Sequence, residues 1–299
     1  MMSAVKSSLK AILPERFMVE YRRAARYYNF QKRSINNLKY MGNVVSCPFC
    51  EKSFSRFRPT GVLDRSFWQS PEGMELLESP EINVANAQCP KCGSGERQRL
   101  LYFYLLKQID FLSFKGIKLL DVAPDYFLWD KVFSISDIKY TSIDITGVRN
   151  PTEIMDITDL KFEENSFDTI ICLHVLEHIP EDIRAMRELH RVLKPGGWAI
   201  LQVPIWAFET VEVPHATRNS YLELYGHSDH VRRYGFDYKD RLEHSGFEVT
   251  VDEFARKLPI DFLSRYGLFE TEDIYFCEKS RTISLETDAI VRFYSENVT

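Results

Sequence analysis

The chain has 299 residues, of which 44% are hydrophobic and 27% are charged, and its formal net charge is −5. This composition excludes a disordered chain, and the length suits one large domain with a smaller one. No apolar run approaches the roughly 20 residues that a membrane-spanning helix needs. The N-terminus also lacks the apolar stretch of a secretory signal, so we expect a cytoplasmic protein.

The first 42 residues differ in charge from the rest of the chain, because they hold nine Lys or Arg residues and only two Glu residues. We expect residues 4–40 to be helical, with a break near Pro14. An apolar face follows from Leu9, Ile12, Leu13, Phe17 and Met18. A basic amphipathic arm of this kind can lie peripherally on the inner face of a membrane, bind nucleic acid, or pack on its own acidic domain. The sequence leaves these three possibilities open.

Residues 43–98 contain two cysteine pairs, Cys47-Pro-Phe-Cys50 and Cys89-Pro-Lys-Cys92, on either side of the insert 51–88. Each pair supplies two thiolates from one tight turn, and four thiolates suit a closed tetrahedral zinc site. We therefore expect Cys47, Cys50, Cys89 and Cys92 to hold a structural Zn²⁺, although the insert is longer than is usual. The alternatives are unrelated thiols or a redox pair. Cys172 and Cys277 are interpreted as small core residues.

From residue 98 onward, strand and helix patterns alternate. A helix is expected at 98–108. The expected strands are 117–122, 140–144, 153–157, 167–173 and 198–203, with helices at about 130–133 and at 181–192. This alternation predicts an α/β domain with a doubly wound parallel sheet, at residues 99–299. The last two strand patterns, 248–254 and 273–278, suit an added hairpin.

Acidic residues end the first two strands of this pattern, at Asp121 and, 23 residues later, at Asp144. In an open parallel sheet, ligands bind at the carboxyl ends of the strands. An acid about 20 residues beyond the first turn is typical of one that binds ribose hydroxyls. We therefore expect Asp144 to bind the ribose of a nucleoside-like cofactor, the alternative being a solvated strand end.

The run from Phe167 to Pro180, with Leu173-His174-Val-Leu-Glu177-His178 at its centre, is the most specific pattern in the chain. Together with Arg191-Val-Leu-Lys-Pro-Gly-Gly197, it resembles the type 11-like group of class I S-adenosylmethionine-dependent methyltransferases. The resemblance implies a Rossmann-like sheet of seven strands, mostly parallel with an antiparallel last strand at 274–277. It also implies S-adenosyl-L-methionine as the cofactor. The four-cysteine module at 43–98 and the basic arm at 1–42 precede this domain.

The resemblance implies further cofactor contacts. It places Asp156 beside the adenine amino group, Ile157 against the ring, and Leu173 and His174 near the sulfonium, while Glu177 and His178 brace the following helix. Asp121, Ala123 and Ile145 complete the expected cofactor site. The first turn, Asp121-Val-Ala123-Pro-Asp125, lacks the glycines of many relatives, which argues against NAD or FAD. We expect the helix after Pro124 to offer its N-terminus to the cofactor carboxylate.

A second histidine-containing segment, Asp229-His230-Val-Arg-Arg-Tyr234, follows the fifth strand. His230 is the first candidate for a general base, with Asp229 orienting it and Tyr234 binding substrate. His174, His227 and His215 are weaker candidates. The alternative is a purely structural loop.

The function predicted from these patterns is methyl transfer to a hydroxyl group of a small molecule or glycan. The glycan preference rests on resemblance to zinc-bearing relatives. The sequence Cys172-Leu-His174-Val disfavours exocyclic amino groups, since enzymes that methylate those carry Asn/Asp-Pro-Pro there. One alternative is an RNA methyltransferase that grips phosphates with the cysteine module, the basic arm, Arg97 and Arg99. The other is a non-catalytic binding protein, suggested by the glycine-free turn.

Overall fold

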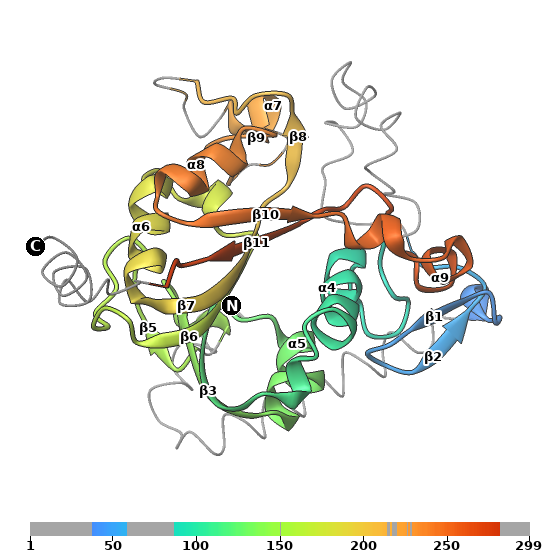
Figure 1. Cartoon of the computed structure of the whole chain (residues 1–299). Coiled ribbons are helices and arrows are strands. Elements are labelled where there is room, and N and C mark those ends of the chain that lie inside the picture. The colour runs from blue at the N-terminus through green and yellow to red at the C-terminus, as the bar shows by residue number, and fades with distance from the viewer. Residues whose placement is uncertain are drawn as a thin grey trace, which may run out of the picture.

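The computed structural model describes residues 38–58, 87–149, 151–213, 216, 220–225, 227 and 229–281. A seven-stranded sheet in the order β10-β11-β7-β6-β3-β4-β5 forms its centre (Figure 1). Its strands are β3 (Lys115–Val122), β4 (Asp137–Asp144), β5 (Glu153–Ile154), β6 (Phe167–Leu173), β7 (Leu193–Gln202), β10 (Glu248–Asp252) and β11 (Ile274–Glu278).

The pairing within this sheet confirms the predicted fold class. The neighbours among β5, β4, β3, β6 and β7 pair in parallel, whereas β11 is antiparallel to both β7 and β10. The chain moves outward from β3 to β4 and β5 on one side, and through β6 and β7 on the other. The strand order therefore reverses between β3 and β6, and this is where parallel sheets place their ligands.

Alternating side chains of the central strands pack into two layers, as the two-residue period of a strand requires. Leu119, Ile171 and Ile200 face helices α4 (Glu96–Lys107) and α5 (Tyr126–Lys131). Leu120, Ile170 and Leu201 face helices α6 (Asp182–Val192) and α8 (Tyr238–His244) on the other side (Figure 1). Each fully buried aliphatic side chain stabilises the fold by about 1.5–3 kcal/mol.

The remaining described elements are short. They are β1 (Val45–Cys47), β2 (Lys52–Phe54), β8 (Ile205–Ala207), β9 (Tyr234–Gly235), α7 (Tyr221–Tyr225) and α9 (Ile260–Tyr266). The 3₁₀ turns are η1 (Leu38–Tyr40), η4 (Phe111–Ser113), η5 (Phe133–Ile135), η6 (Gly147–Arg149), η7 (Leu176–His178) and η8 (Phe254–Lys257).

Helix α6 and the turn after it show why the pattern around residues 181–197 predicts a helix and its end. Ala185, Met186, Leu189 and Val192 are all buried, at the spacing of one helix face. The chain then enters β7, where Gly197 lies against β6. A Cβ atom at Gly197 would be 2.7 Å from the carbonyl oxygen of Asp168, so only glycine fits there without a shift.

Two predicted elements differ from the structure for a local reason. The helix expected after Pro124, to which 130–133 was assigned, is α5, which starts at Tyr126 with its first amides capped by the Asp125 side chain, as expected of a helix start. This helix ends at Lys131, however, and Phe133 begins the 3₁₀ turn η5. The strand expected at 153–157 ends at Ile154. Shortly beyond it, Asp156 accepts hydrogen bonds from the backbone N–H and hydroxyl of Thr158, both at 2.8 Å, and the chain turns.

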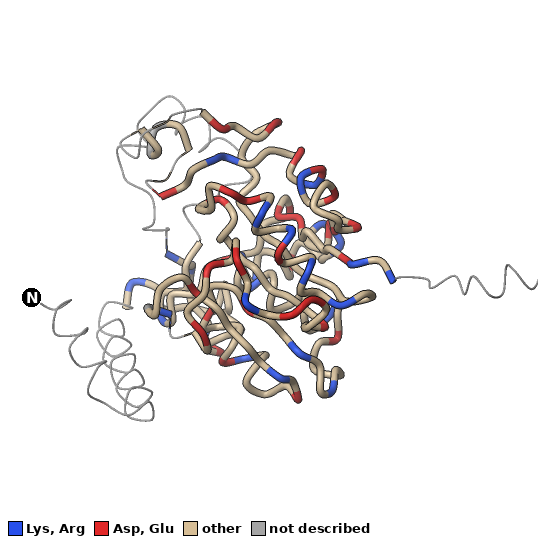
Figure 2. The backbone as a smooth tube through the Cα atoms, turned by 90° about the vertical axis from the view of Figure 1, so that its left-hand side faces the viewer, with Lys and Arg blue, Asp and Glu red and all other residues tan. Residues whose placement is uncertain are grey.

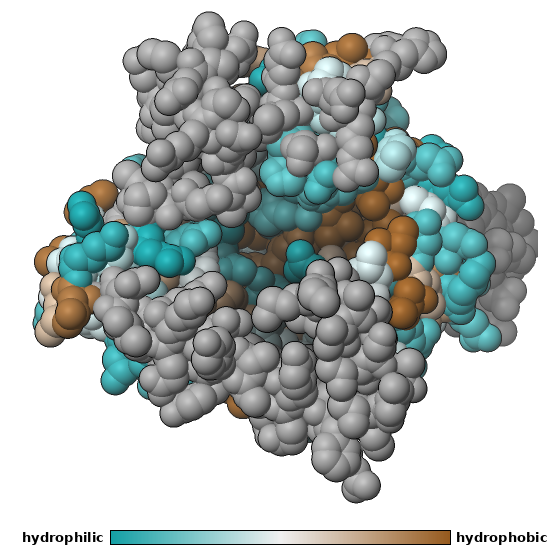
Figure 3. All heavy atoms as spheres, turned by 180° about the vertical axis from the view of Figure 1, so that it is seen from behind, coloured by the Kyte–Doolittle hydropathy of each residue, from teal (hydrophilic) through white to brown (hydrophobic). Residues whose placement is uncertain are grey.

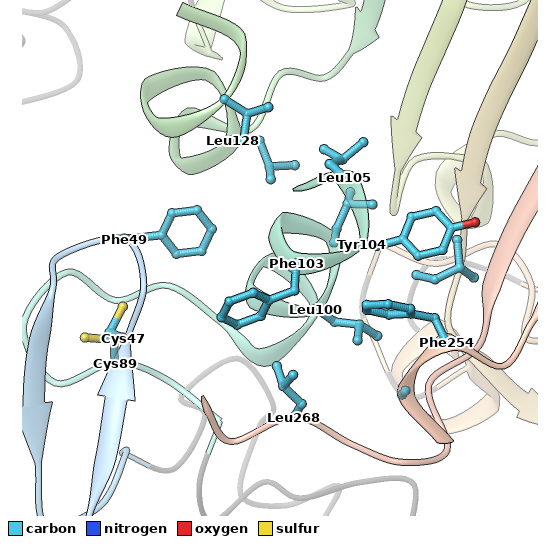
Figure 4. Packing of buried hydrophobic residues seen from close by; sticks show 14 of the residues in the cluster. Cys47, Phe49, Cys89, Leu100, Phe103, Tyr104, Leu105, Leu128, Phe254 and Leu268 are labelled. Carbon is cyan, nitrogen blue, oxygen red and sulfur yellow. The ribbon is translucent and has the colours of Figure 1, made fainter. Parts of the chain in front are cut away.

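The cysteine pairs and the sheet share one hydrophobic cluster (Figure 4). In this view Phe49 points from the β1–β2 turn toward helix α4, where Leu100 and Phe103 continue the cluster toward Phe254. The expected boundary between residues 98 and 99 falls inside α4. The boundaries of the three expected units stay predictions, and most of the basic arm and of the insert lies outside the described residues.

Arg99 joins the cysteine-containing segment to the chain around Gly267, and its side chain is 0% exposed. Its guanidinium lies 4.1 Å above the ring of Phe57. It donates hydrogen bonds of 2.7–3.1 Å to four backbone carbonyls, those of Ala87, Ser94, Tyr266 and Gly267. The expectation that Arg99 grips RNA phosphates is therefore wrong, because all of these donors point inward.

Basic and acidic positions are interspersed along the described backbone in Figure 2. The face seen in Figure 3 is hollowed near its centre, with apolar residues on the floor and hydrophilic residues around it. Within the described part of the chain, no helix combines the length and apolarity needed to cross a membrane.

Candidate functional site

A cavity of about 190 Å³ lies at the carboxyl ends of β3, β6 and β7. Asp121, Ala123, Leu173 and His174, four of the expected cofactor residues, are in its wall. Ionisable side chains of both signs also line it, namely Arg97, Asp125, Arg149 and Glu272, beside apolar residues such as Leu100, Leu101 and Ile274. The sheet thus brings the ends of the first and fourth expected strands to one small cavity whose wall is partly apolar and partly charged.

Asp121 lines this cavity and is 2% exposed. Burial raises the pKa of its carboxyl group to about 8, although the hydroxyl of Tyr140 donates it a 2.7 Å hydrogen bond that acts in the opposite direction. The carboxyl group of Asp121 is therefore protonated over much of the neutral range.

Ala123 turns the chain directly after β3, with φ of +53°. This left-handed conformation is unfavourable for a residue with a Cβ atom, and glycine is its usual occupant. The Ala123 amide donates a 2.8 Å hydrogen bond to the carbonyl of Ile143. The backbone thus turns as a glycine-containing loop would, although the sequence lacks the glycine.

The start of α5 does not match the expectation of a free helix N-terminus. The Asp125 side chain accepts hydrogen bonds from the amides of Phe127 at 2.8 Å and Leu128 at 3.3 Å. The amides expected to face the cofactor carboxylate are therefore occupied, and that prediction is wrong. Two arginines in the cavity wall, Arg97 and Arg149, supply the positive charge instead.

Asp144 ends β4 as expected and is 9% exposed. One of its oxygens accepts hydrogen bonds from the amide and hydroxyl of Thr146, at 2.7 and 2.8 Å. Its other oxygen lies 3.6 Å from Nε of Arg149. Arg149 also donates a 3.2 Å hydrogen bond to the carbonyl of Ala123. Arg149 therefore connects Asp144 to the cavity wall, and the binding of ribose by Asp144 stays a prediction.

The other expected cofactor residues, Ile145 and the two adenine contacts Asp156 and Ile157, lie outside the cavity wall. Ile145 is 66% exposed, and Asp156 is exposed and bonded to Thr158. Ile157 is 5% exposed and belongs to the second hydrophobic cluster. The structure does not bring these three residues together with Asp121, and their roles stay predictions.

Residues 229–234 dock onto the turn that follows β6. Arg232, which is 3% exposed, donates hydrogen bonds to three carbonyls in that turn, those of Leu176, Ile179 and Pro180. Tyr234 is fully buried and donates a 2.7 Å hydrogen bond to Asp182. The expectation that Tyr234 binds substrate is therefore wrong, and its hydroxyl holds the start of α6 instead.

This docking gathers four of the seven histidines of the chain around Glu177. The ring centroid of His230 lies 4.8 Å from that of His178 and 4.6 Å from that of His227, and His174 Nδ1 is 3.4 Å from a Glu177 oxygen. His215 lies outside the described residues. Sequence analysis assigned Glu177 and His178 a bracing role and did not pair them with His230.

Electrostatics in this histidine cluster (His174, Glu177, His178, His227 and His230) favour neutral imidazole at His230. Burial lowers the pKa of His230 to about 4. Burial opposes ionisation of Glu177, yet the rings of His174 and His178 hold the pKa of Glu177 below its ordinary value. A neutral His230 is compatible with the predicted general base.

Asp229 contacts two histidines of the same cluster through its main-chain groups. Its carbonyl lies 3.0 Å from Nδ1 of His178, and its amide donates a 3.2 Å hydrogen bond to Nδ1 of His227. These contacts fix the two rings. The predicted orientation of His230 by the Asp229 carboxylate stays a prediction.

The four cysteines of the two pairs converge as the spacing predicts. Sγ of Cys47 lies 3.6 Å from that of Cys92, Sγ of Cys50 lies 3.6 Å from that of Cys89, and the four ligand atoms are within 4.8 Å of one another. A disulfide would bring two sulfurs to about 2 Å. Sulfurs around a tetrahedral zinc ion are about 3.8 Å apart, so these residues fit that metal.

Both cysteine turns have the same backbone form. The amides of Glu51 and Gly93 donate to the carbonyls of Cys47 and Cys89, at 2.9 and 3.0 Å. Glu51 and Gly93 themselves have φ of 55° and 87°. Cys172 and Cys277 lie apart in the sheet, and both are buried as expected.

Comparison with known proteins gives matches that cover part of the chain. Residues 136–201 match the family model described as a methyltransferase domain. A demethylmenaquinone methyltransferase of Staphylococcus epidermidis is 42% identical over 45 residues, which is 15% of this chain and 19% of that protein. A tRNA U34 carboxymethyltransferase of Nautilia profundicola is 28% identical over 138 residues, which is 46% of this chain and 41% of that protein.

Among solved structures, a 1,6-didemethyltoxoflavin-N1-methyltransferase of Burkholderia thailandensis with bound S-adenosylhomocysteine has a TM-score of 0.42 and 13% identity. The match covers 61% of this chain and 78% of that one. The chain spans less than half the length of the two curated relatives, 19% and 41%. Residues 136–201, from just before β4 to the end region of β7, are similar to the methyltransferase domain family, and this supports a methyltransferase domain in the chain.

Proposed function

We propose that this protein transfers a methyl group from S-adenosylmethionine, held in the cavity at the carboxyl ends of β3 and β6. The observation that carries the proposal is the mixed charge of the cavity wall, where Arg97 and Arg149 lie with Asp121 and Glu272. The methionine end of the cofactor carries an ammonium and a carboxylate group, so a wall with both signs of charge complements it.

Each wall residue then has a role. Arg97, whose Nε is 3.6 Å from Glu272, is placed to bind the cofactor carboxylate, and Asp121 to accept from its ammonium group. The ammonium charge favours the ionised form of Asp121, so binding lowers the pKa of that carboxyl group. Asp144 binds the ribose after Arg149 moves aside, and Leu173 and His174 border the sulfonium.

We propose a hydroxyl group of a small molecule or glycan as the methyl acceptor. The sequence Cys172-Leu-His174 after β6 supports a hydroxyl, because it lacks the signature of amino-group methylation. One curated relative is named for a small acceptor, demethylmenaquinone. In the reaction, the acceptor oxygen bonds to the methyl carbon, the carbon–sulfur bond breaks, and the hydroxyl loses its proton. Holding the two reactants in line supplies much of the rate enhancement.

Methylation of RNA is the second candidate, and the likeness to a tRNA-modifying enzyme favours it. The inward-pointing donors of Arg99 count against it.

The cofactor proposal is tested by calorimetry with S-adenosylmethionine. We expect Asp144→Asn to weaken binding by at least about tenfold, since a buried hydrogen-bonding carboxylate is lost. The control is Asp159→Asn, an exposed acid paired with Lys161, which should bind within about twofold of the unaltered protein. A folded protein that does not bind the cofactor would overturn the proposal.

The acceptor proposal is tested with methyl-labelled cofactor and fractionated cell extract. Label in small organic or glycan fractions supports the first candidate. Label confined to RNA supports the second and overturns the first.

We infer that Cys47, Cys50, Cys89 and Cys92 hold a structural Zn²⁺. Their convergence and the paired turns support this. Four thiolates fill a tetrahedral shell, so such an ion stabilises the module and has no position for a reacting water.

A further inference from the structure

We propose that Glu177, His178 and His230 form a second metal site, which binds a divalent cation on the acceptor side of the cofactor cavity. The role of this cation, which is to hold the acceptor oxygen, rests on the proposed methyl transfer. The presence of the metal site follows from the positions of the three side chains and does not depend on that function.

The donor atoms of these three residues converge. One carboxylate oxygen and one ring nitrogen from each histidine lie within 4.8 Å of one another. One carboxylate with two imidazoles is a frequent ligand set for divalent iron, manganese or zinc, and it leaves coordination positions open.

The tautomer of His178 is the one that a metal ligand needs. Its Nδ1 lies 3.0 Å from the carbonyl oxygen of Asp229. A carbonyl only accepts hydrogen bonds, so Nδ1 carries the proton and Nε2 keeps its lone pair. Ligand histidines are commonly fixed by such a hydrogen bond to a carbonyl.

His227 provides an internal contrast. Its Nδ1 accepts a 3.2 Å hydrogen bond from the amide of Asp229, so in the neutral ring the proton is on Nε2. Neither nitrogen of His227 then has a lone pair to offer. His227 instead stacks on His230, with centroids 4.6 Å apart and an interplanar angle of 28°.

Glu177 supplies a second and independent observation. Its side chain is 2% exposed, and its Oε2 has no hydrogen-bond partner among the described residues. A buried carboxylate oxygen without a partner is costly, whereas a cation bound to it would satisfy it. Its other oxygen, Oε1, lies 3.4 Å from Nδ1 of His174.

The backbone around the three ligands is held in place. Arg232 bonds the carbonyls of the turn that carries Glu177 and His178, and the amide of Val231 donates a 2.9 Å hydrogen bond to the carbonyl of Glu177. Ligands that are separated by more than 50 residues are thus fixed on one scaffold, as a metal site requires.

The site adjoins the cavity through His174, which lines the cavity wall and contacts Glu177. A cation there lowers the pKa of a bound hydroxyl group and orients it toward the methyl carbon. The hydroxyl proton then goes to water as the oxygen–carbon bond forms, and the electron pair of the carbon–sulfur bond stays on sulfur. An acceptor with two neighbouring oxygens, such as a vicinal diol, can occupy two open positions.

The experiment uses the full-length protein with its cysteines first saturated with zinc and the excess removed. Mn²⁺ is titrated in, and the electron paramagnetic resonance signal of free Mn²⁺ is followed. Mn²⁺ favours oxygen and nitrogen ligands over thiolates. We expect the unaltered protein to bind one Mn²⁺, and His178→Ala and Glu177→Gln each to lose at least about tenfold in affinity.

A histidine variant outside the cluster serves as the control. His244 on α8 also has its Nδ1 2.7 Å from a main-chain carbonyl, that of Asp240, but lies outside the cluster. His244→Ala should keep Mn²⁺ affinity within about threefold, because His244 neither supplies a ligand nor contacts one. A loss in His244→Ala as large as that in His178→Ala would overturn the assignment of ligands.

The proposal is overturned if the unaltered protein binds no Mn²⁺, or if a folded His178→Ala binds it equally well. His178→Ala decides the matter if Glu177→Gln does not fold. Calorimetry with S-adenosylmethionine on the same samples separates the two proposals. Cofactor binding without Mn²⁺ binding removes only the cation site, and Mn²⁺ binding without cofactor binding removes only the proposed function.

Discussion

The hydroxyl of Tyr140 donates a 2.7 Å hydrogen bond to the buried carboxyl group of Asp121. Tyr140 lies on β4 and Asp121 on β3, so the bond joins two neighbouring strands beside the switch point, which lies between β3 and β6. Asp121 also lines the wall of the cavity at the carboxyl ends of β3, β6 and β7.

The first prediction concerns stability and pH. The pKa of Asp121 is about 8 in the folded protein and 3.8 ordinarily, so between these values the folded state holds a proton that the unfolded state releases. The stability contributed by this proton is fully present below the ordinary pKa and is lost as pH rises toward 8. In the unaltered protein, ionisation of Asp121 should lower the free energy of unfolding by up to about 1.4 kcal/mol for each pH unit in this range. Asp121→Asn should lack this decrease.

Urea unfolding of the cofactor-free protein at several pH values between 5 and 8 measures this slope. Equal slopes in the variant and the unaltered protein would show that Asp121 is not the responsible group.

The second prediction concerns the cysteines. Cys89→Ser removes one of four converging thiols, so we expect zinc content to fall from one ion per chain to a small fraction and the melting temperature to decrease. Metal analysis and circular dichroism measure the two effects. The matched control is Cys277→Ala, a fully buried cysteine in the sheet, which should keep its zinc even where it lowers stability. Zinc retained in Cys89→Ser would contradict the four-cysteine assignment.

The third prediction concerns Arg99. Arg99→Met leaves four inward-facing carbonyls without their donor, and we expect the free energy of unfolding to decrease by about 2–4 kcal/mol. Arg184→Met is the control, since Arg184 is exposed and pairs with Glu181 at 3.7 Å. Such a surface pair contributes less than about 1 kcal/mol. Similar unfolding midpoints for the two variants would contradict the structural role of Arg99.

The fourth prediction concerns His230. His230→Ala should lower turnover at least about tenfold, because it removes a ligand of the proposed cation. The affinity for S-adenosylmethionine should change by less than about twofold, because His230 is not in the described cavity wall. A methyl-transfer assay and calorimetry provide the two measurements. Normal turnover in the variant would leave the loop 229–234 with a structural role alone.

Much of the sheet was predictable because its signals are local. The strand at 167–173 has the expected bounds, and α6 follows from buried residues on one helix face. The helix after Pro124 was expected to include residue 133, but it ends at Lys131. The cap that the Asp125 side chain places on its first amides is a contact that periodicity does not report.

The candidate site was less predictable because it depends on contacts between distant segments. Asp121 was expected from a strand end, and Leu173 and His174 from the family resemblance, and all three line the cavity. The pairing of Asp144 with Arg149 depends on the local path of the turn after β4, which periodicity does not report. The grouping of Glu177 with His230 depends on how two distant loops dock. Arg232 holds residues 229–234 on the turn after β6, which is more than 50 residues away in the sequence. The only sequence signal for this contact was the presence of histidines both near Glu177 and at 227–230.

The segment around Arg99 and the segment around Gly267 cannot be exchanged independently of one another in a chimaera of this protein. The guanidinium of Arg99 is shared between carbonyls that precede it and carbonyls some 170 positions later. If only one of the two segments were transferred to a homologue, either the buried guanidinium of Arg99 or the carbonyl oxygens that it bonds would lose their hydrogen-bond partners. The recipient protein would have to supply the missing partner at the same place.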